Sequence, residues 1–104
     1  MDDRHAPGRA ALLTAILDGD GATDRAARRA AFDGEPADPA VAAYVATVRA
    51  HAYRVTDEDV AALRATGLDD PGIFELTVAA ALGQAEQQYQ AAVAALAAVT
   101  EEVA

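Results

Sequence analysis

The apolar positions of this chain recur at the three- and four-residue spacing that is typical of amphipathic helices. Arg9–Leu17 carries four large apolar residues on one face, namely Leu12, Leu13, Ile16 and Leu17. Asp24–Phe32 predicts a second, alanine-rich helix. Asp38 followed by Pro39 predicts the capped start of a third helix, which runs to about His51 and presents Val41, Tyr44, Val45 and Val48. No segment alternates convincingly as a β-strand does, so the pattern predicts an all-α fold.

The next two helices have clear start and stop signals. Thr56 can cap the amide of Asp59, and the acidic residues after Thr56 complement the positive end of a helix. Gly67 ends this helix, because glycine readily adopts the left-handed conformation that follows a helix. Asp70–Pro71 repeats the cap-then-proline opening, and it predicts a last helix that runs to about Val99.

The last helix is long and almost uncharged. Its main apolar stripe consists of Phe74, Val78, Leu82, Ala85, Tyr89, Val93 and Leu96. Glu86 is the only charged residue between Leu76 and Thr100. A helix with so little polar surface lies inside a bundle or between subunits, and a domain this small favours a subunit interface. Gly83 would let a second helix approach closely. We therefore expect a homo-oligomer that forms through the 71–99 helix.

The length of the chain predicts a single helical domain, over residues 1–104. Residues 1–8 are expected to be a loose tail, residues 9–52 to form the N-terminal helices, and residues 55–99 to form a helical pair. The expected architecture is a small bundle of four to five helices.

The charge of the chain restricts its partners. The formal net charge is −9, from 17 acidic residues and 8 arginines without lysine. A nucleic-acid partner is not expected, because phosphate contacts need a basic face. Residues 65–104 contain acids and no base, so this part can attract a basic protein partner, although solubility explains the same charge. There is no signal peptide pattern and no apolar run of about 20 residues, so we expect a cytoplasmic protein without a membrane span.

The absence of cysteine excludes disulfides, thiol catalysis and thiolate metal sites. Asp18–Gly21 could begin an EF-hand calcium loop, but Thr23 stands where that loop needs glycine and Arg29 where it needs glutamate. We expect a turn there instead. The sequence therefore predicts no cofactor and no metal site.

Val55–Leu96 resembles the carboxymuconolactone decarboxylase and alkylhydroperoxidase D-like (AhpD-like) family. The resemblance rests on a capped helix that ends in Gly67–Leu68, the segment Ile73–Leu76, and an alanine-rich helix with Gly83. It implies an all-helical subunit that assembles into trimers, hexamers or similar rings through its long helices.

The same resemblance limits the chemistry. The peroxidase-like branch of the family carries Cys-x-x-Cys-x-x-x-His on an upstream helix, where this chain has Val41–Ala52 with Tyr44, Arg49 and His51. Because this chain has no cysteine, thiol peroxidase and disulfide reductase activities are excluded. The decarboxylase branch uses no metal or redox cofactor and stays open.

Five residues are candidates for acid–base chemistry or for binding a small carboxylate: His51, Arg49, Arg54, Glu86 and Glu75. His51 can titrate near neutrality, or it is simply a histidine favoured at a helix end. Arg49 and Arg54 can hold a substrate carboxylate or pair with surface acids. Glu75 can be a helix-start acid, and Glu86 can be either a buried, paired carboxylate or an exposed residue among glutamines.

Two functions follow from these residues. The first is a cysteine-free, oligomeric helical protein that acts as a scaffold, an accessory subunit or a small-ligand binder. The alternative is a cofactor-independent decarboxylase, lyase or isomerase that acts on a small carboxylate or lactone. In that enzyme His51 would be the acid or base, Arg49 or Arg54 would hold the carboxylate, and Glu86 or Glu75 would assist. An enclosed pocket that joins these side chains would favour the enzyme.

Overall fold

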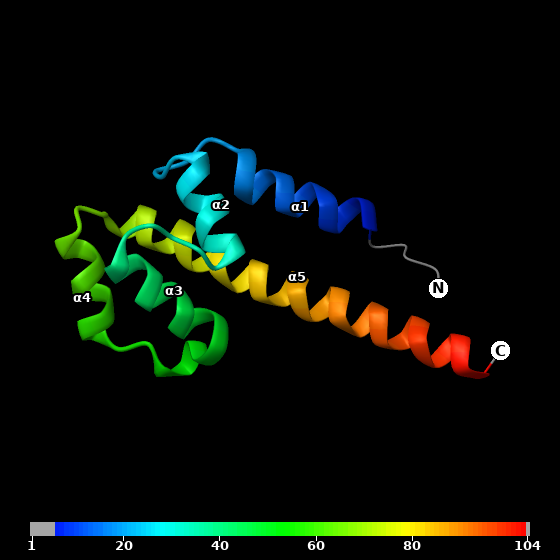
Figure 1. The fold of residues 1–104 in the computed structure, drawn as a ribbon. Coiled ribbons are helices and arrows are strands. Elements are labelled where there is room, and N and C mark those ends of the chain that lie inside the picture. The colour runs from blue at the N-terminus through cyan, green and yellow to red at the C-terminus, as the bar shows by residue number, and fades with distance from the viewer. Residues whose placement is uncertain (1–5, 104) are drawn as a thin grey trace.

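The structure is a computed structural model that describes residues 6–103. Within them the chain forms α1 (Ala6–Asp18), α2 (Arg25–Asp33), α3 (Pro39–His51), the 3₁₀ turn η1 (Ala52–Arg54), α4 (Asp57–Ala65) and α5 (Asp70–Val103) (Figure 1). The described residues contain no strand. The predicted all-α bundle with a long C-terminal helix is therefore confirmed.

The starts of α3 and α4 follow the predicted capping chemistry, and α2 has a cap of the same kind that was not predicted. The Asp24 carboxylate accepts a hydrogen bond from the Ala27 amide, and Asp38 does the same for the first amides of α3. Thr56 and Asp59 form a reciprocal capping box at the start of α4. These contacts satisfy amides that have no partner within the helix, so local sequence alone determines where α2, α3 and α4 begin.

The start of α5 differs from the prediction by one residue. Asp69, and not Asp70, accepts the amide hydrogen bond of Gly72. Asp70 is instead the first residue of the helix, and its carboxylate accepts a hydrogen bond from Arg64 Nε at 2.8 Å. This pair raises the pKa of the Arg64 guanidinium.

The end of α5 and the start of α1 also differ from their predicted positions. Helix α5 continues to Val103, four residues beyond the predicted end near Val99, because no glycine, proline or capping residue interrupts it. At the other end, α1 begins at Ala6. It therefore includes the last three residues of the segment expected to be a loose tail, and residues 1–5 of that segment lie outside the described part of the chain.

The core lies where α2, α3 and α4 meet the first half of α5. Its buried members are Leu17, Ala31, Tyr44, Val45, Val48, Leu63, Ile73, Leu76, Ala79 and Ala80. The described chain is elongated, measuring 55 by 28 by 21 Å, because α5 continues past this body (Figure 1). None of the described helices is long and apolar enough to cross a membrane.

Gly83 marks the closest approach between α5 and another helix. A methyl group at Gly83 would lie 1.9 Å from the carbonyl oxygen of Phe32, far inside van der Waals contact. The sequence predicted that a second helix would approach Gly83 closely. In the structure that helix is α2 of the same chain, at its C-terminal end. The absence of a side chain at Gly83 sets how tightly α2 packs on α5.

Candidate functional site

The end of α3 exposes His51 and Arg54 to solvent. The His51 and Tyr53 rings meet edge to face at 5.7 Å, and the Tyr53 hydroxyl lies 3.5 Å from His51 Nδ1. The Arg54 guanidinium lies 5.7 Å from the centroid of the Tyr53 ring. Tyr53 is 79% exposed. This cluster lies on the surface of the protein.

Arg49 lies elsewhere, between three helices. Its Nη1 donates a hydrogen bond of 2.6 Å to the Phe32 carbonyl, and its Nη2 donates one of 2.9 Å to Gln87 Oε1. A cation is favoured at the C-terminal end of α2, where unpaired carbonyls carry partial negative charge. Arg49 thus joins α3, the end of α2 and α5 beside Gly83. Both of these hydrogen bonds hold parts of the fold together.

Glu86 is paired with Arg9. A paired carboxylate was one of the two alternatives that the sequence left open for this residue. Its carboxylate accepts hydrogen bonds from Arg9 Nη1 and from Gln90 Nε2. The Arg9 guanidinium also lies 4.3 Å from the centroid of the Tyr89 ring. The hydrogen bond from Arg9, followed by that from Gln90, lowers the pKa of the Glu86 carboxyl, against an opposing effect of burial. Glu86 therefore attaches α1 to the middle of α5.

Glu75 organises the loop between α1 and α2. Its carboxylate accepts hydrogen bonds from the Ala22 amide at 2.6 Å, from the Thr23 amide at 3.1 Å and from the Thr23 hydroxyl at 2.8 Å. The bond from Ala22 contributes most to lowering the pKa of Glu75, while burial opposes it. A methyl group at Gly21 would lie 2.5 Å from the same carboxylate, so the loop closes tightly around it.

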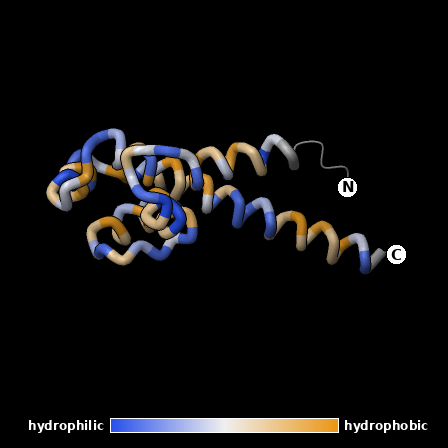
Figure 2. Tube along the Cα trace, turned by 90° about the horizontal axis from the view of Figure 1, so that it is seen from above, coloured by the Kyte–Doolittle hydropathy of each residue, from blue (hydrophilic) through white to orange (hydrophobic). Residues whose placement is uncertain are grey.

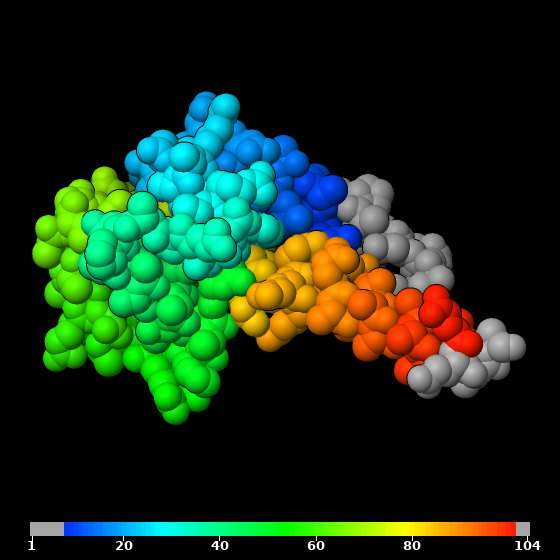
Figure 3. Space-filling model, viewed as in Figure 1, coloured from blue at the N-terminus to red at the C-terminus, as the bar shows by residue number. Residues whose placement is uncertain are grey.

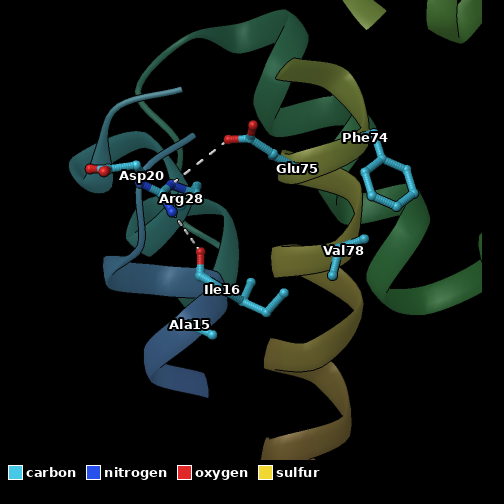
Figure 4. Close-up of a pocket in the computed structure, with 7 residues that line it drawn as sticks. All are labelled: Ala15, Ile16, Asp20, Arg28, Phe74, Glu75 and Val78. Atoms are coloured by element: carbon cyan, nitrogen blue, oxygen red, sulfur yellow. Dashed lines mark hydrogen bonds and ion pairs between the residues drawn. The ribbon is translucent and has the colours of Figure 1, made fainter. Parts of the chain in front are cut away.

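Arg28 is a buried cation that the sequence did not single out. It is 4% exposed, its Nη1 donates a hydrogen bond of 2.8 Å to the Ile16 carbonyl, and its Nε lies 4.0 Å from Glu75 Oε1 (Figure 4). Its Nε has no hydrogen-bond partner among the described residues. Arg28 and Ala31 share one face of α2 because they are three residues apart, but nothing in the sequence shows that this face is buried.

The small pocket at Arg28 is a poor site for an anion. Its volume is about 180 Å³, and Asp20 and Glu75 line it together with Arg28. Two carboxylates beside one guanidinium give a negative balance, which would repel a carboxylate ligand. Figure 4 shows Glu75 directed toward Arg28, whereas Phe74 projects from the other side of α5.

A second pocket, of about 410 Å³, lies between α2, the start of α3 and the α4–α5 connection. Its lining is mainly apolar and includes Ala27, Ala30, Val41, Leu68 and Leu76. This volume falls within the usual range for small-ligand sites. Neither pocket is lined by His51, Arg49 or Arg54, so the predicted catalytic group is not assembled around them. No group of three or more histidine, aspartate or glutamate side chains within residues 6–103 could hold a metal ion.

The most distinctive surface belongs to α5. We define the α5 outer face as the uncharged row Phe74, Val78, Ala81, Ala85, Ala92, Leu96 and Val99. Phe74 is 69% exposed, Leu96 51% and Val99 56%. Figure 3 shows the C-terminal part of α5 extending beyond the body, and Figure 2 shows hydrophobic turns along that part. Exposed apolar surfaces of this kind are typical of interaction sites.

Comparison of the chain with protein-family models, curated proteins and solved structures gives no match.

Proposed function

We propose that this protein is a non-enzymatic helical scaffold or accessory subunit that works as a homo-oligomer built through the 71–99 helix. The observation that carries the proposal is the exposed, uncharged α5 outer face. Water contact with such a surface is unfavourable, and a second protein surface removes it. A cysteine-free, AhpD-like, cytoplasmic protein is part of the proposal, on the basis of the sequence.

The arrangement of charged residues supports a structural role over a catalytic one. Arg49, Glu75 and Glu86 each bind another segment of the same chain. His51 and Arg54 stand apart from them at an exposed helix end. General acid–base catalysis requires such groups to converge on one reacting atom, and here they support separate contacts.

The apolar pocket between α2 and α3 supports the small-ligand form of the same proposal. Its size and lining suit a compact apolar molecule of the kind that such clefts bind. A small carboxylate is the less suitable ligand, because the two carboxylates at this pocket, Asp24 and Asp38, would repel it.

Light scattering coupled to size exclusion tests the assembly, and an oligomer mass at micromolar concentration is expected. A monomer mass at that concentration would contradict the proposal. Decarboxylation assays with small lactones and dicarboxylates test the enzymatic alternative. If the protein turns over one of these compounds and the His51→Ala variant does not, the lyase hypothesis would replace the scaffold hypothesis.

A further inference from the structure

The apolar pocket between α2 and the start of α3 has a wall that belongs to the core. Leu76 is 2% exposed, and the half-buried Val41 and Leu68 pack against the core. All three line the pocket, whose volume of about 410 Å³ can hold a compact ring system. The pocket lies where α5 begins, away from the projecting part of α5, residues 91–103 (Figure 1). Its described lining includes no member of the α5 outer face, so a ligand there is compatible with an oligomer through that face.

The polar side chains at this pocket accept hydrogen bonds and have none to donate. Among the described residues that line it, those with polar side chains are Asp24, Asp38 and Thr66. An ionised carboxylate carries no hydrogen. The single hydroxyl hydrogen of Thr66 is already donated to the Leu63 carbonyl at 2.6 Å. A ligand that these side chains hold must therefore supply the donors itself.

Both carboxylates are held in place through one of their two oxygens. Oδ1 of Asp24 accepts the Ala27 amide at 2.7 Å. Oδ1 of Asp38 accepts the Ala40 amide at 2.8 Å and the Val41 amide at 3.3 Å. No described residue donates a hydrogen bond to Oδ2 of either carboxylate. The same bonds occupy amides at two helix starts that an anion could otherwise use, so the pocket offers fixed negative charge and little that binds an anion.

No base balances the two carboxylates at the pocket. Arg25 follows Asp24 along the chain, but it is not among the described residues that line the pocket. The formal net charge of −9 also attracts cations at longer range. A cation beside an apolar wall gains more from a carboxylate than it would in open water, because the wall lowers the local dielectric constant. The lining therefore selects a cation with an apolar body over an anion or a purely apolar molecule.

We infer that this pocket binds a small amine. The compact apolar body of the amine lies against Val41, Leu68 and Leu76, and its protonated nitrogen donates hydrogen bonds to the carboxylates of Asp24 and Asp38. This inference rests on the small-ligand form of the proposed function and names the chemical class of its ligand. It does not depend on the oligomer.

Three probes that share one rigid apolar body test the choice of charge: adamantylamine, adamantanol and adamantanecarboxylate. At neutral pH the first is a cation, the second is neutral and the third is an anion. In NMR titrations of isotope-labelled protein, the amine should shift the amide signals of Ala27, Ala30 and Leu68. Its dissociation constant should be about tenfold or more below that of the alcohol, because hydrogen bonds between charged groups are stronger than neutral ones. The carboxylate should bind most weakly, and added salt should weaken binding of the amine alone.

Asparagine substitutions remove the charge and keep the fold, because asparagine caps a helix about as well as aspartate does. A double variant with Asp24→Asn and Asp38→Asn should bind the amine and the alcohol about equally. The matched control is a double variant with Asp57→Asn and Asp59→Asn. It removes the same charge at the start of α4, outside the described lining of the pocket, and should keep the preference for the amine.

The preference of the wild type for the amine decides the inference. Equal affinities for the amine and the alcohol would overturn the inference alone and leave a small-ligand pocket, as would a preference that persists in the Asp24→Asn, Asp38→Asn variant. If no probe bound, or if the shifted amides lay outside the pocket, both the inference and the small-ligand form of the proposed function would be wrong. The oligomer is tested separately by light scattering.

Discussion

The two parts of α5 have similar composition and opposite environments. In residues 72–83 the buried positions are Gly72, Ile73, Leu76, Ala79, Ala80 and Gly83, all against other helices of the chain. In residues 91–101 no position is buried, although these residues are just as apolar. The difference shows that apolar composition makes a helix available for packing but does not determine which partner covers it.

The anchored part owes its position to polar contacts as well as to its core. Glu75 and Glu86 attach it to the α1–α2 loop and to α1, and Gln87 attaches it to Arg49. Beyond Gln90, no hydrogen bond from an α5 side chain to another described helix is present. Among the described residues, the projecting part is therefore held to the rest of the chain through the anchored part of α5 alone.

The strongest test of the anchored part is Gly83→Ala. The added methyl group would overlap the Phe32 carbonyl, so α2 must move away and the hydrogen bond from Arg49 must weaken. We expect a loss of at least about 3 kcal/mol of unfolding free energy, measured by urea denaturation. Gly8→Ala is the matched control: it lies within α1 and nothing approaches its added methyl group, so helix propensity should stabilise it by up to about 1 kcal/mol. Equal stabilities for the two variants would contradict the close α2–α5 packing.

Glu75→Gln tests the polar attachment of the same part. The substitution weakens three hydrogen bonds and leaves Arg28 buried without its nearest carboxylate, so we expect a loss of about 2 kcal/mol at neutral pH. The pKa of Glu75 is lowered in the folded state. Its stabilisation is therefore complete above the unfolded pKa, near pH 4.3, and is lost as the pH falls through the folded pKa. The gap between wild type and variant should shrink in urea titrations repeated at about pH 3. A gap that stays constant or widens in acid would show that the carboxylate is not the stabilising group.

Leu96→Asp tests the projecting part. Leu96 is 51% exposed and lies outside the core, so the variant should fold as the wild type does and keep its helical circular dichroism. Its self-association should weaken by about tenfold or more, because an unpaired charge would be buried in the interface. Ala94→Asp introduces the same charge on the opposite face of the helix, and its mass in light scattering should match that of the wild type. If both substitutions weakened association equally, a general charge effect would replace the outer-face explanation.

The smallest effect is expected from His51→Ala. His51 is exposed and its described ring contact is with Tyr53, so the substitution should remove about 1 kcal/mol or less and leave the oligomer mass unchanged. NMR titration of the ring provides the companion measurement. A chemical shift or titration midpoint that moves when small dicarboxylates are added would revive the catalytic hypothesis for this residue.

The sequence predicted what neighbouring residues determine. The caps at Asp38 and Thr56 and the glycine end at Gly67 depend on contacts within a few residues, so their signals are visible in the chain. The end of α5 was less predictable, because no local signal stops the helix.

The contacts between distant segments were not predictable in the same way. Glu75 is recognised by Ala22 and Thr23, which precede it by more than 50 residues, and no periodicity links them. The apolar stripe was assigned by the size of its residues, whereas the close approach of α2 selected Ala79, Ala80 and Gly83 for the core. Likewise, a substrate carboxylate and surface acids were the two partners expected for Arg49, because nothing in the sequence shows that it reaches the end of α2.

Amide hydrogen exchange along α5, followed at two protein concentrations, tests the central claim most directly. The account predicts slow exchange in residues 72–83 at both concentrations, because the chain's own core protects them. In residues 91–103, exchange should be slow in concentrated protein and faster after dilution, because a second copy supplies the protection. Exchange in the projecting part that is equally fast, or equally slow, at both concentrations would contradict the claim that another copy of the chain covers it.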